Sequence, residues 1–206
     1  MLRGRDIKKY QINFSDKWII NTHNGTKINN ISPIKVQEDY PIIYNHLMKY
    51  KDELQKRQDR GDHWTNLRNC AYLDDFDKEK LVWIELTDKP NFALDTNGFY
   101  LNNTIFFMTG KHLKYLMGYL NSKICEWHFD KIAATSGVGT RRWIKVYIDQ
   151  ICIPMFKSDV ENDLYKLIDN INNETKNDIL KKINTFFYKK FDLTEEEIEE
   201  IENSNL

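Results

Sequence analysis

The sequence predicts a mixed α/β fold of the α+β class, with a body of short strands and helices followed by a helical segment. Two observations indicate this. Up to about Ile153-Pro154, short apolar runs of β type alternate with apolar positions at helical spacing. Beyond that point the chain is polar, and its apolar residues recur at helical spacing over 158–190 and 194–203. We therefore expect two parts, a body over 1–156 and a C-terminal helical segment over 157–206.

The first half of the body predicts a strand, a helix and a polar loop. Residues 17–22 have the composition of a strand that enters a turn. A helix is expected from Asp39 to about Arg57, because apolar residues fall at helical spacing and Pro41 suits a first turn. Residues 58–70 are polar and predict a turn-rich loop.

The second half of the body predicts several strands and two adjacent helices. Strands are expected at 81–86 and 104–108, and 92–95 with 99–101 predicts a hairpin. Amphipathic helices are expected at 111–121 and 122–132. The remaining predicted strands are 145–149 and 151–153.

The composition excludes several classes of protein. The 206 residues suffice for one domain of ordinary size plus an appendage, and 13% aromatic residues argue against a disordered chain. No apolar run approaches 18 residues and 1–6 has no apolar signal region, so we expect neither a membrane span nor a secretory signal. Three cysteines, far apart, suggest a reducing compartment, and we expect the cytoplasm.

The net charge of −1 is unevenly distributed. Residues 1–150 carry 23 Lys and Arg against 18 Asp and Glu, whereas 151–206 carry 7 against 13. The last fifteen residues hold seven acids and no base. A basic body with an acidic tail is compatible with nucleic-acid binding by the body, and a solvated acidic helix on a neutral protein is the alternative.

The sequence lacks the common motifs of catalysis and cofactor binding. It has no GxGxxG, no Walker A loop, no Asn-Pro-Pro-Tyr, no CxxC pair and no HExxH. The five histidines show no ligand spacing: His23, His46, His63, His112 and His128. We therefore expect no cofactor and no metal in this chain, and no enzyme activity from the chain alone.

Two segments have residue types that suit DNA contact. The first lies at the predicted helix end and in the following loop, where forked guanidinium groups and aromatic rings can meet phosphates and bases. Its candidates are Arg57, Arg60, His63, Trp64 and Arg68. The alternative is a helix C-terminus whose bases complement the helix dipole.

The second segment joins the predicted 122–132 helix to the following strand. Its glycines permit close backbone approach, and its hydroxyls and cations suit phosphates and base edges. Its candidates are Ser136, Gly137, Gly139, Thr140, Arg141, Arg142 and Lys145. A flexible connector is the alternative.

Read in order, these pieces resemble the TaqI-like C-terminal specificity domain of type IIG restriction–modification enzymes. That domain is itself similar to the target recognition domains of type I specificity subunits. Each motif is short, and their order and spacing over about 2–156 give the resemblance. The matching segments are 2–10, 40–54 with Arg57, 61–64 with 67–68, 80–83, 92–100, 119–123, 137–141 and 151–154.

The resemblance implies a target-recognition-domain-like body that reads a short sequence of double-stranded DNA. It implies partners in the same enzyme: a methyltransferase domain, adenine-specific and S-adenosylmethionine-dependent, and a Mg²⁺-dependent nuclease domain. It also implies a bacterial restriction–modification system of type II. The chain then resembles the C-terminal portion of a longer enzyme, a site-specific DNA methyltransferase and restriction endonuclease, with a separately encoded subunit as the other possibility.

Two alternatives to the recognition module remain open from the sequence. The densest carboxylates are Asp74, Asp75, Asp77 and Glu79, which could form a metal-dependent nuclease site. A solvated turn is the simpler interpretation of these acids. The second alternative is a protein-interaction subunit whose helical tail docks a partner.

Overall fold

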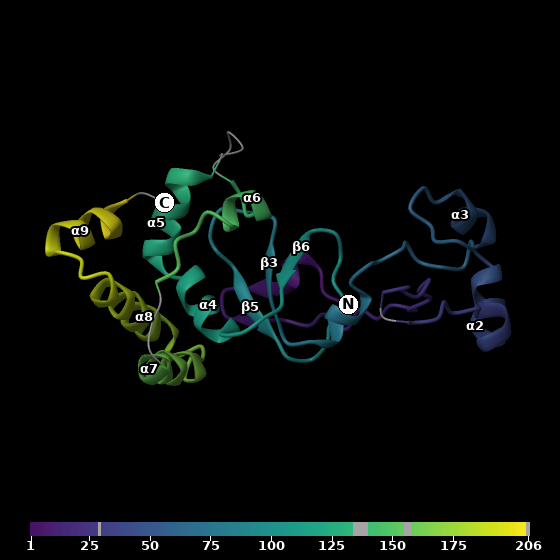
Figure 1. The fold of residues 1–206 in the computed structure, drawn as a ribbon, viewed down its shortest axis with the longest axis horizontal. Helices are drawn as coiled ribbons and strands as arrows, with labels where there is room; N and C mark the ends of the chain where they lie inside the picture. Colours follow the sequence, from purple (N-terminus) through teal and green to yellow (C-terminus); the bar gives the residue numbers. More distant parts are fainter. Residues whose placement is uncertain (29, 134–139, 155–157, 205–206) are drawn as a thin grey trace. The chain divides into compact units, whose positions relative to one another are not determined.

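A computed structural model describes residues 1–28, 30–133, 140–154 and 158–204 and shows a mixed α+β fold, as predicted (Figure 1). The chain forms two compact units. The first, which we call the core unit, combines 1–17 with 79–206. The second, the 18–78 unit, is an insertion between the two parts of the core unit.

A three-stranded antiparallel sheet is the centre of the core unit. β3 (Lys80–Ile84) lies between β5 (Phe92–Asp95) and β6 (Ile105–Met108), with Val82 opposite Ala93 on one side and Phe107 on the other. Two small ribbons accompany it. The first pairs β1 (Ile7–Lys8) with β2 (Gln11–Ile12) after the short 3₁₀ turn Gly4–Asp6, and the second pairs β4 (Leu86–Thr87) with β7 (Arg141–Arg142).

Within the described residues, five helices complete the core unit together with the one-turn helix α6 (Lys145–Ile148), which follows β7. They are α4 (Leu113–Leu120), α5 (Lys123–Ile132), α7 (Ser158–Asp169), α8 (Lys176–Lys190) and α9 (Glu195–Asn203). The predicted helical tract 158–190 is thus two helices, α7 and α8, separated by a turn. None of the helices in the described ranges is long and apolar enough to cross a membrane.

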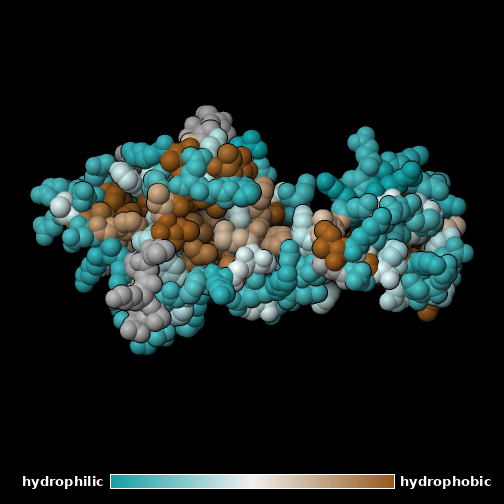
Figure 2. All heavy atoms as spheres, viewed as in Figure 1, coloured by the Kyte–Doolittle hydropathy of each residue, from teal (hydrophilic) through white to brown (hydrophobic). Residues whose placement is uncertain are grey.

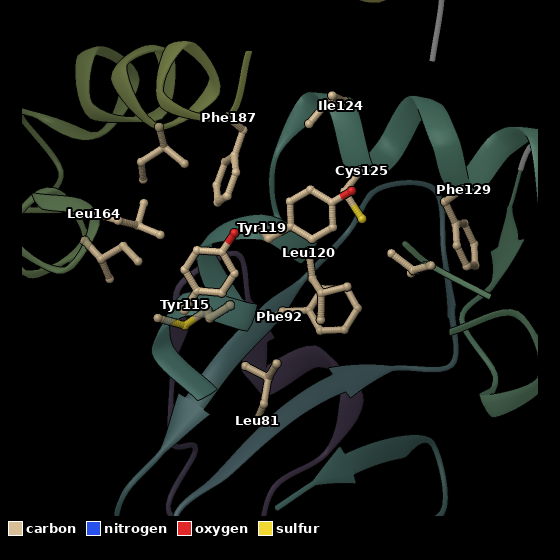
Figure 3. Close-up of a cluster of buried hydrophobic side chains, with 14 of the residues drawn as sticks. Leu81, Phe92, Tyr115, Tyr119, Leu120, Ile124, Cys125, Phe129, Leu164 and Phe187 are labelled. Atoms are coloured by element: carbon tan, nitrogen blue, oxygen red, sulfur yellow. The ribbon is translucent and has the colours of Figure 1, made fainter. Parts of the chain in front are cut away.

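One hydrophobic core joins the sheet to the C-terminal helices (Figure 3). Tyr119 of α4 packs against Phe187 of α8 with ring centroids 5.2 Å apart, and both side chains are buried. A Cβ atom on Gly118 would lie 3.1 Å from side-chain carbons of Leu164 and Ile168, so the glycine permits the close approach of α4 and α7. The boundary that we predict at 156 therefore separates two parts that share one core.

An ion pair is buried inside the sheet. Lys80 on β3 and Asp95 on β5 face each other across the pair of strands, with Nζ and Oδ2 2.7 Å apart and both side chains fully buried. The same carboxylate accepts hydrogen bonds from the amides of Asn97 and Phe99. Asp95 thus holds the turn after β5 as well as the lysine, and this explains why the following residues leave the sheet.

The predicted hairpin over 92–101 is wrong. β5 pairs with β3 and not with 99–101, and Leu101 instead makes an isolated bridge to Leu2. The apolar and turn pattern indicated two extended segments correctly, but a hairpin requires that the two pair with each other, and long-range partners displaced that pairing.

Three other local predictions differ from the structure. Residues 17–22 form no strand, because the Thr22 hydroxyl and carbonyl bond to Thr65 and Leu67. The predicted strand at 145–149 is the helical turn α6, and 151–153 is irregular.

The predicted helix over 39–57 is divided in two. It consists of α2 (Pro41–Met48) and α3 (Lys51–Lys56), because the amides of Lys49 and Tyr50 bond three residues back and end α2.

The 18–78 unit is organised by polar contacts more than by an apolar core. Besides α2 and α3 it contains α1 (Val36–Asp39) and the 3₁₀ turn Leu73–Asp77. Asn66 is buried and donates to the carbonyls of His23 and Ile34, and it accepts from the Thr65 hydroxyl at 2.7 Å. The bonds to His23 and Ile34 join loop segments that are more than thirty residues apart in the sequence.

Candidate nucleic-acid interface

Arg141 lies inside the protein. Its side chain is 7% exposed, and its guanidinium makes a two-pronged contact with the Asp130 carboxylate of α5. A third nitrogen donates to the Asp88 carbonyl and lies 3.5 Å from a Glu126 carboxylate oxygen. All three guanidinium nitrogens thus have partners within the fold.

The prediction of an exposed Arg141 is therefore wrong, and the pleat of β7 gives the reason. Neighbouring residues of a strand face opposite sides, so Arg141 and Trp143 share one face and Arg142 the other. Trp143 is 1% exposed and stacks on Phe129 with ring centroids 3.7 Å apart. Arg141 holds β7 on α5 and is withdrawn from the predicted contact residues.

The opposite face of the ribbon is open to solvent. Arg142 has a side chain 52% exposed and forms an ion pair with Glu85 at 2.8 Å. Lys145 on α6 is 80% exposed and pairs with Asp149. Leu86 and Val146 are also more than half exposed, and Figure 2 shows hydrophobic surface over α6. This surface combines cations with apolar side chains.

The loop before β7 carries the remaining candidates of this segment. Ser136, Gly137 and Gly139 lie outside the described residues. Thr140, which the structure describes, is partly buried. The assignment of these four residues to DNA contact stays a prediction.

Two candidates of the 18–78 unit stabilise its loop. Arg57 follows α3 and donates to the carbonyls of Trp64 and Asn66, at 3.1 and 3.0 Å. Trp64 is 8% exposed and packs against Tyr44, with Lys51 over its ring. The hydrogen bonds of Arg57 and the packing of Trp64 therefore indicate that these side chains position the loop, whereas the sequence predicts DNA contact for both.

The other three candidates of the 18–78 unit are exposed. Arg60 uses one nitrogen to bond the Gln55 carbonyl at 2.9 Å, which fixes the guanidinium at the surface. His63 bonds the Thr65 hydroxyl through Nδ1 at 2.8 Å. Arg68 is exposed two residues beyond the buried Asn66. These side chains have the charge and access that a phosphate contact requires.

The ionisable groups give no indication of a catalytic site in the described ranges. Burial in the core raises the pKa of the Cys125 thiol and of the Tyr119 hydroxyl, and burial lowers the pKa of His23. No group of three or more His, Cys, Asp or Glu side chains in the described part of the chain could hold a metal ion. Of the acids at 74–79, Asp74 and Asp75 both contact Lys78. A hydrogen bond from Lys78 to Asp75 raises the pKa of that lysine.

Sequence reasoning missed the acids and the apolar residue of the ribbon. Glu85 and Leu86 are more than fifty residues from β7 in the sequence, and Glu126 and Asp130 lie on α5, the helix before β7. The alternation in Arg141-Arg142-Trp143 was the one local signal, since a tryptophan on a strand indicates which face is buried.

Two comparisons with known proteins gave a match. A model of the family described as the TaqI-like C-terminal specificity domain matches residues 1–154. The type II methyltransferase M.MjaIV of Methanocaldococcus jannaschii is 24% identical over 148 residues, which cover 67% of this chain and 49% of the relative. The chain thus spans about half the length of this curated relative.

Proposed function

Because this chain belongs to the family of TaqI-like C-terminal specificity domains, we propose that it recognises a short sequence of double-stranded DNA in a restriction–modification system. The family match over 1–154 is the observation that carries the proposal. The exposed cations of the ribbon, of α6 and of the 18–78 unit support it, because phosphates are the first feature of DNA that a protein meets.

The exposed and buried arginines have different roles in this proposal. Arg60, Arg68 and Lys145 contact phosphates and fix the position of the domain on the duplex. Arg142 reaches a base edge, as argued below. Arg57 and Arg141 hold the loops that carry these side chains, and they act through position only.

Catalysis belongs to other domains of the same enzyme. We propose that an adenine-specific methyltransferase domain, with S-adenosylmethionine, and a Mg²⁺-dependent nuclease domain act at the site that this chain selects, in the cytoplasm. A relative that is named a methyltransferase, and of which the matched segment covers only 49%, supports this division. The enzyme then has the type IIG organisation, with recognition in its C-terminal part.

DNA binding by the chain should depend strongly on salt. For a labelled random duplex we expect a dissociation constant in the micromolar range or weaker. The logarithm of the association constant should fall linearly with the logarithm of the salt concentration. Lys145→Gln should reduce the salt slope by about one, because one phosphate contact is lost. Fluorescence anisotropy at several salt concentrations measures both. Lys181→Gln on α8 is the matched control and should leave the slope unchanged, and an affinity that does not vary with salt would contradict the proposal.

The chain alone should neither methylate nor cleave DNA. Incubation with labelled S-adenosylmethionine and mixed-sequence DNA should transfer no label, and Mg²⁺ should produce no nicks in plasmid DNA. The Asp74, Asp75 and Lys78 contacts favour a solvated turn over a nuclease site. Plasmid cleavage that disappears in an Asp74→Asn, Asp75→Asn variant would establish the nuclease alternative instead.

The acidic helix α9 should not contact DNA, because its carboxylates are repelled by phosphate. Replacing the exposed Glu195, Glu196, Glu199 and Glu200 by glutamine should leave DNA affinity equal or higher in the anisotropy assay. This variant is cleaner than deletion of 192–206, because Ile201 is buried in the core and Glu202 bonds Tyr188. A large loss of affinity in the glutamine variant would show that α9 takes part in binding.

A further inference from the structure

The open face of the β4–β7 ribbon pairs an apolar side chain with a forked cation. Leu86 and Arg142 are opposite each other in the antiparallel register. The Trp143 amide donates to the Glu85 carbonyl at 2.7 Å, so Leu86 and Arg142 form the non-hydrogen-bonded pair, in which side chains lie closest. The Leu86 side chain is 54% exposed. A leucine stabilises the fold when its side chain is buried, so more than half of this apolar surface contributes nothing to folding.

The ribbon is fixed from its buried face. The Trp83 indole donates to the Trp143 carbonyl at 2.7 Å, and Trp143 stacks on Phe129. Arg141 adds its contacts with Asp130 and the Asp88 carbonyl. Because the base of the ribbon is held in this way, the backbone at Leu86 and Arg142 loses little freedom when a ligand covers their side chains.

Glu85 changes what Arg142 can recognise. The Glu85 carboxylate lies 2.8 Å from one Arg142 nitrogen and engages that side of the guanidinium. An arginine held against this mostly buried carboxylate gains less from a phosphate than Lys145 does, whose side chain and partner Asp149 are 80% and 56% exposed. The remaining N–H donors of the planar Arg142 guanidinium have fixed directions, which suit a pair of uncharged hydrogen-bond acceptors. On the major-groove edge of DNA, O6 and N7 of guanine are such a pair.

Leu86 offers only apolar contact. The thymine C5-methyl group is the apolar feature that distinguishes base pairs in the major groove, and a two-stranded ribbon fits into that groove. A non-hydrogen-bonded pair places its Cα atoms about 4.5 Å apart, which is close to the rise of about 3.4 Å between base pairs.

We infer that Leu86 and Arg142 read neighbouring base pairs in the major groove, Leu86 through a thymine methyl group and Arg142 through a guanine. The inference rests on the proposed function and deepens it, because it assigns sequence reading to one pair of side chains. The remaining exposed cations of the domain then supply affinity without sequence preference.

The test begins with the preference of the full chain, obtained by enrichment from a library of random duplexes. Each preferred thymine is then replaced singly by deoxyuridine, which lacks the methyl group, and each preferred guanine by 7-deazaguanine, which lacks N7. For the wild-type chain we expect one deoxyuridine position at which affinity falls about fourfold, the factor for one buried methyl group at about 0.8 kcal/mol. A 7-deazaguanine position should lie next to it.

Three variants distinguish an effect on base recognition from an effect on stability. Leu86→Ser should bind the thymine and deoxyuridine duplexes equally, and Arg142→Ala should lose the 7-deazaguanine effect because alanine has no donor for N7. Val146→Ser on α6 changes an equally exposed apolar residue and should keep both effects. Thermal melting should show wild-type stability for all three.

The outcomes separate this inference from the proposed function. A Leu86→Ser chain that still discriminates thymine from deoxyuridine overturns the inference, and so does a wild-type chain that enriches a sequence but tolerates deoxyuridine everywhere. Both results leave the recognition function in place. A chain that enriches no sequence overturns the proposed function and this inference with it.

Discussion

Replacement of Arg141 by alanine is expected to lower the free energy of unfolding by about 3–5 kcal/mol, the usual loss when a buried ion pair is broken. The substitution leaves the Asp130 and Glu126 carboxylates near each other without their cation. One Glu126 oxygen is already buried without a hydrogen bond and depends on the charge of this arginine. For a chain of this size, the loss lowers the melting temperature by roughly 6–20 °C.

The neighbouring arginine is the control for this measurement. Arg142→Ala removes a half-exposed side chain whose ion pair with Glu85 contributes little, so the free energy of unfolding should change by no more than about 0.5 kcal/mol. Urea unfolding of the two variants compares them directly. An Arg141→Ala chain that unfolds like the wild type and yet loses DNA binding would show that this arginine contacts DNA after all.

Replacement of Asp95 by alanine is expected to have an effect of similar size, about 3–5 kcal/mol. The carboxylate is fully buried, and it is the partner of Lys80 as well as the acceptor for the Asn97 and Phe99 amides. Its removal leaves a buried ammonium group and two backbone donors without this acceptor, and each unsatisfied group carries its own desolvation penalty.

A second substitution tests whether the buried charge is the cause. Asp95→Asn keeps an oxygen for only one of the two turn amides and leaves Lys80 charged, so it should destabilise strongly. The double variant Lys80→Met, Asp95→Asn should recover part of that loss, because it removes the charge together with its partner. A double variant that is less stable than either single variant would mean that the pair contributes through packing rather than charge.

Much of the fold could be read from local patterns. The strand β6 lies inside its predicted apolar run, β3 begins one residue before its own, and α4, α5 and α9 lie within a few residues of their predicted bounds. These elements depend on apolar spacing over one or two turns, which the sequence displays directly. The family also followed from sequence, because the order of short motifs survives even where each motif is weak, and the match over 1–154 confirmed it.

The candidate site was only partly readable. The basic segments around Arg60 and Arg142 do present cations, but the sequence could not tell which arginine of each segment faces solvent. Arg57 is occupied by carbonyls up to nine residues away, and Arg141 by Asp130 and by the Asp88 carbonyl fifty-three residues away. The composition of a segment indicates which groups its side chains can bind. It gives no information on the hydrogen-bond partners that distant parts of the chain provide.

By itself, then, the sequence determined the α+β class, most helices, two central strands and the family. The tertiary structure decided that β5 pairs with β3, that 145–148 is helical, and that Arg141 faces inward while Arg142 faces outward. The physical reason is that successive side chains of a strand point to opposite faces of the sheet. The register of the strand against a distant partner therefore decides which set of side chains is buried. For β7 that partner is β4, more than fifty residues earlier in the chain.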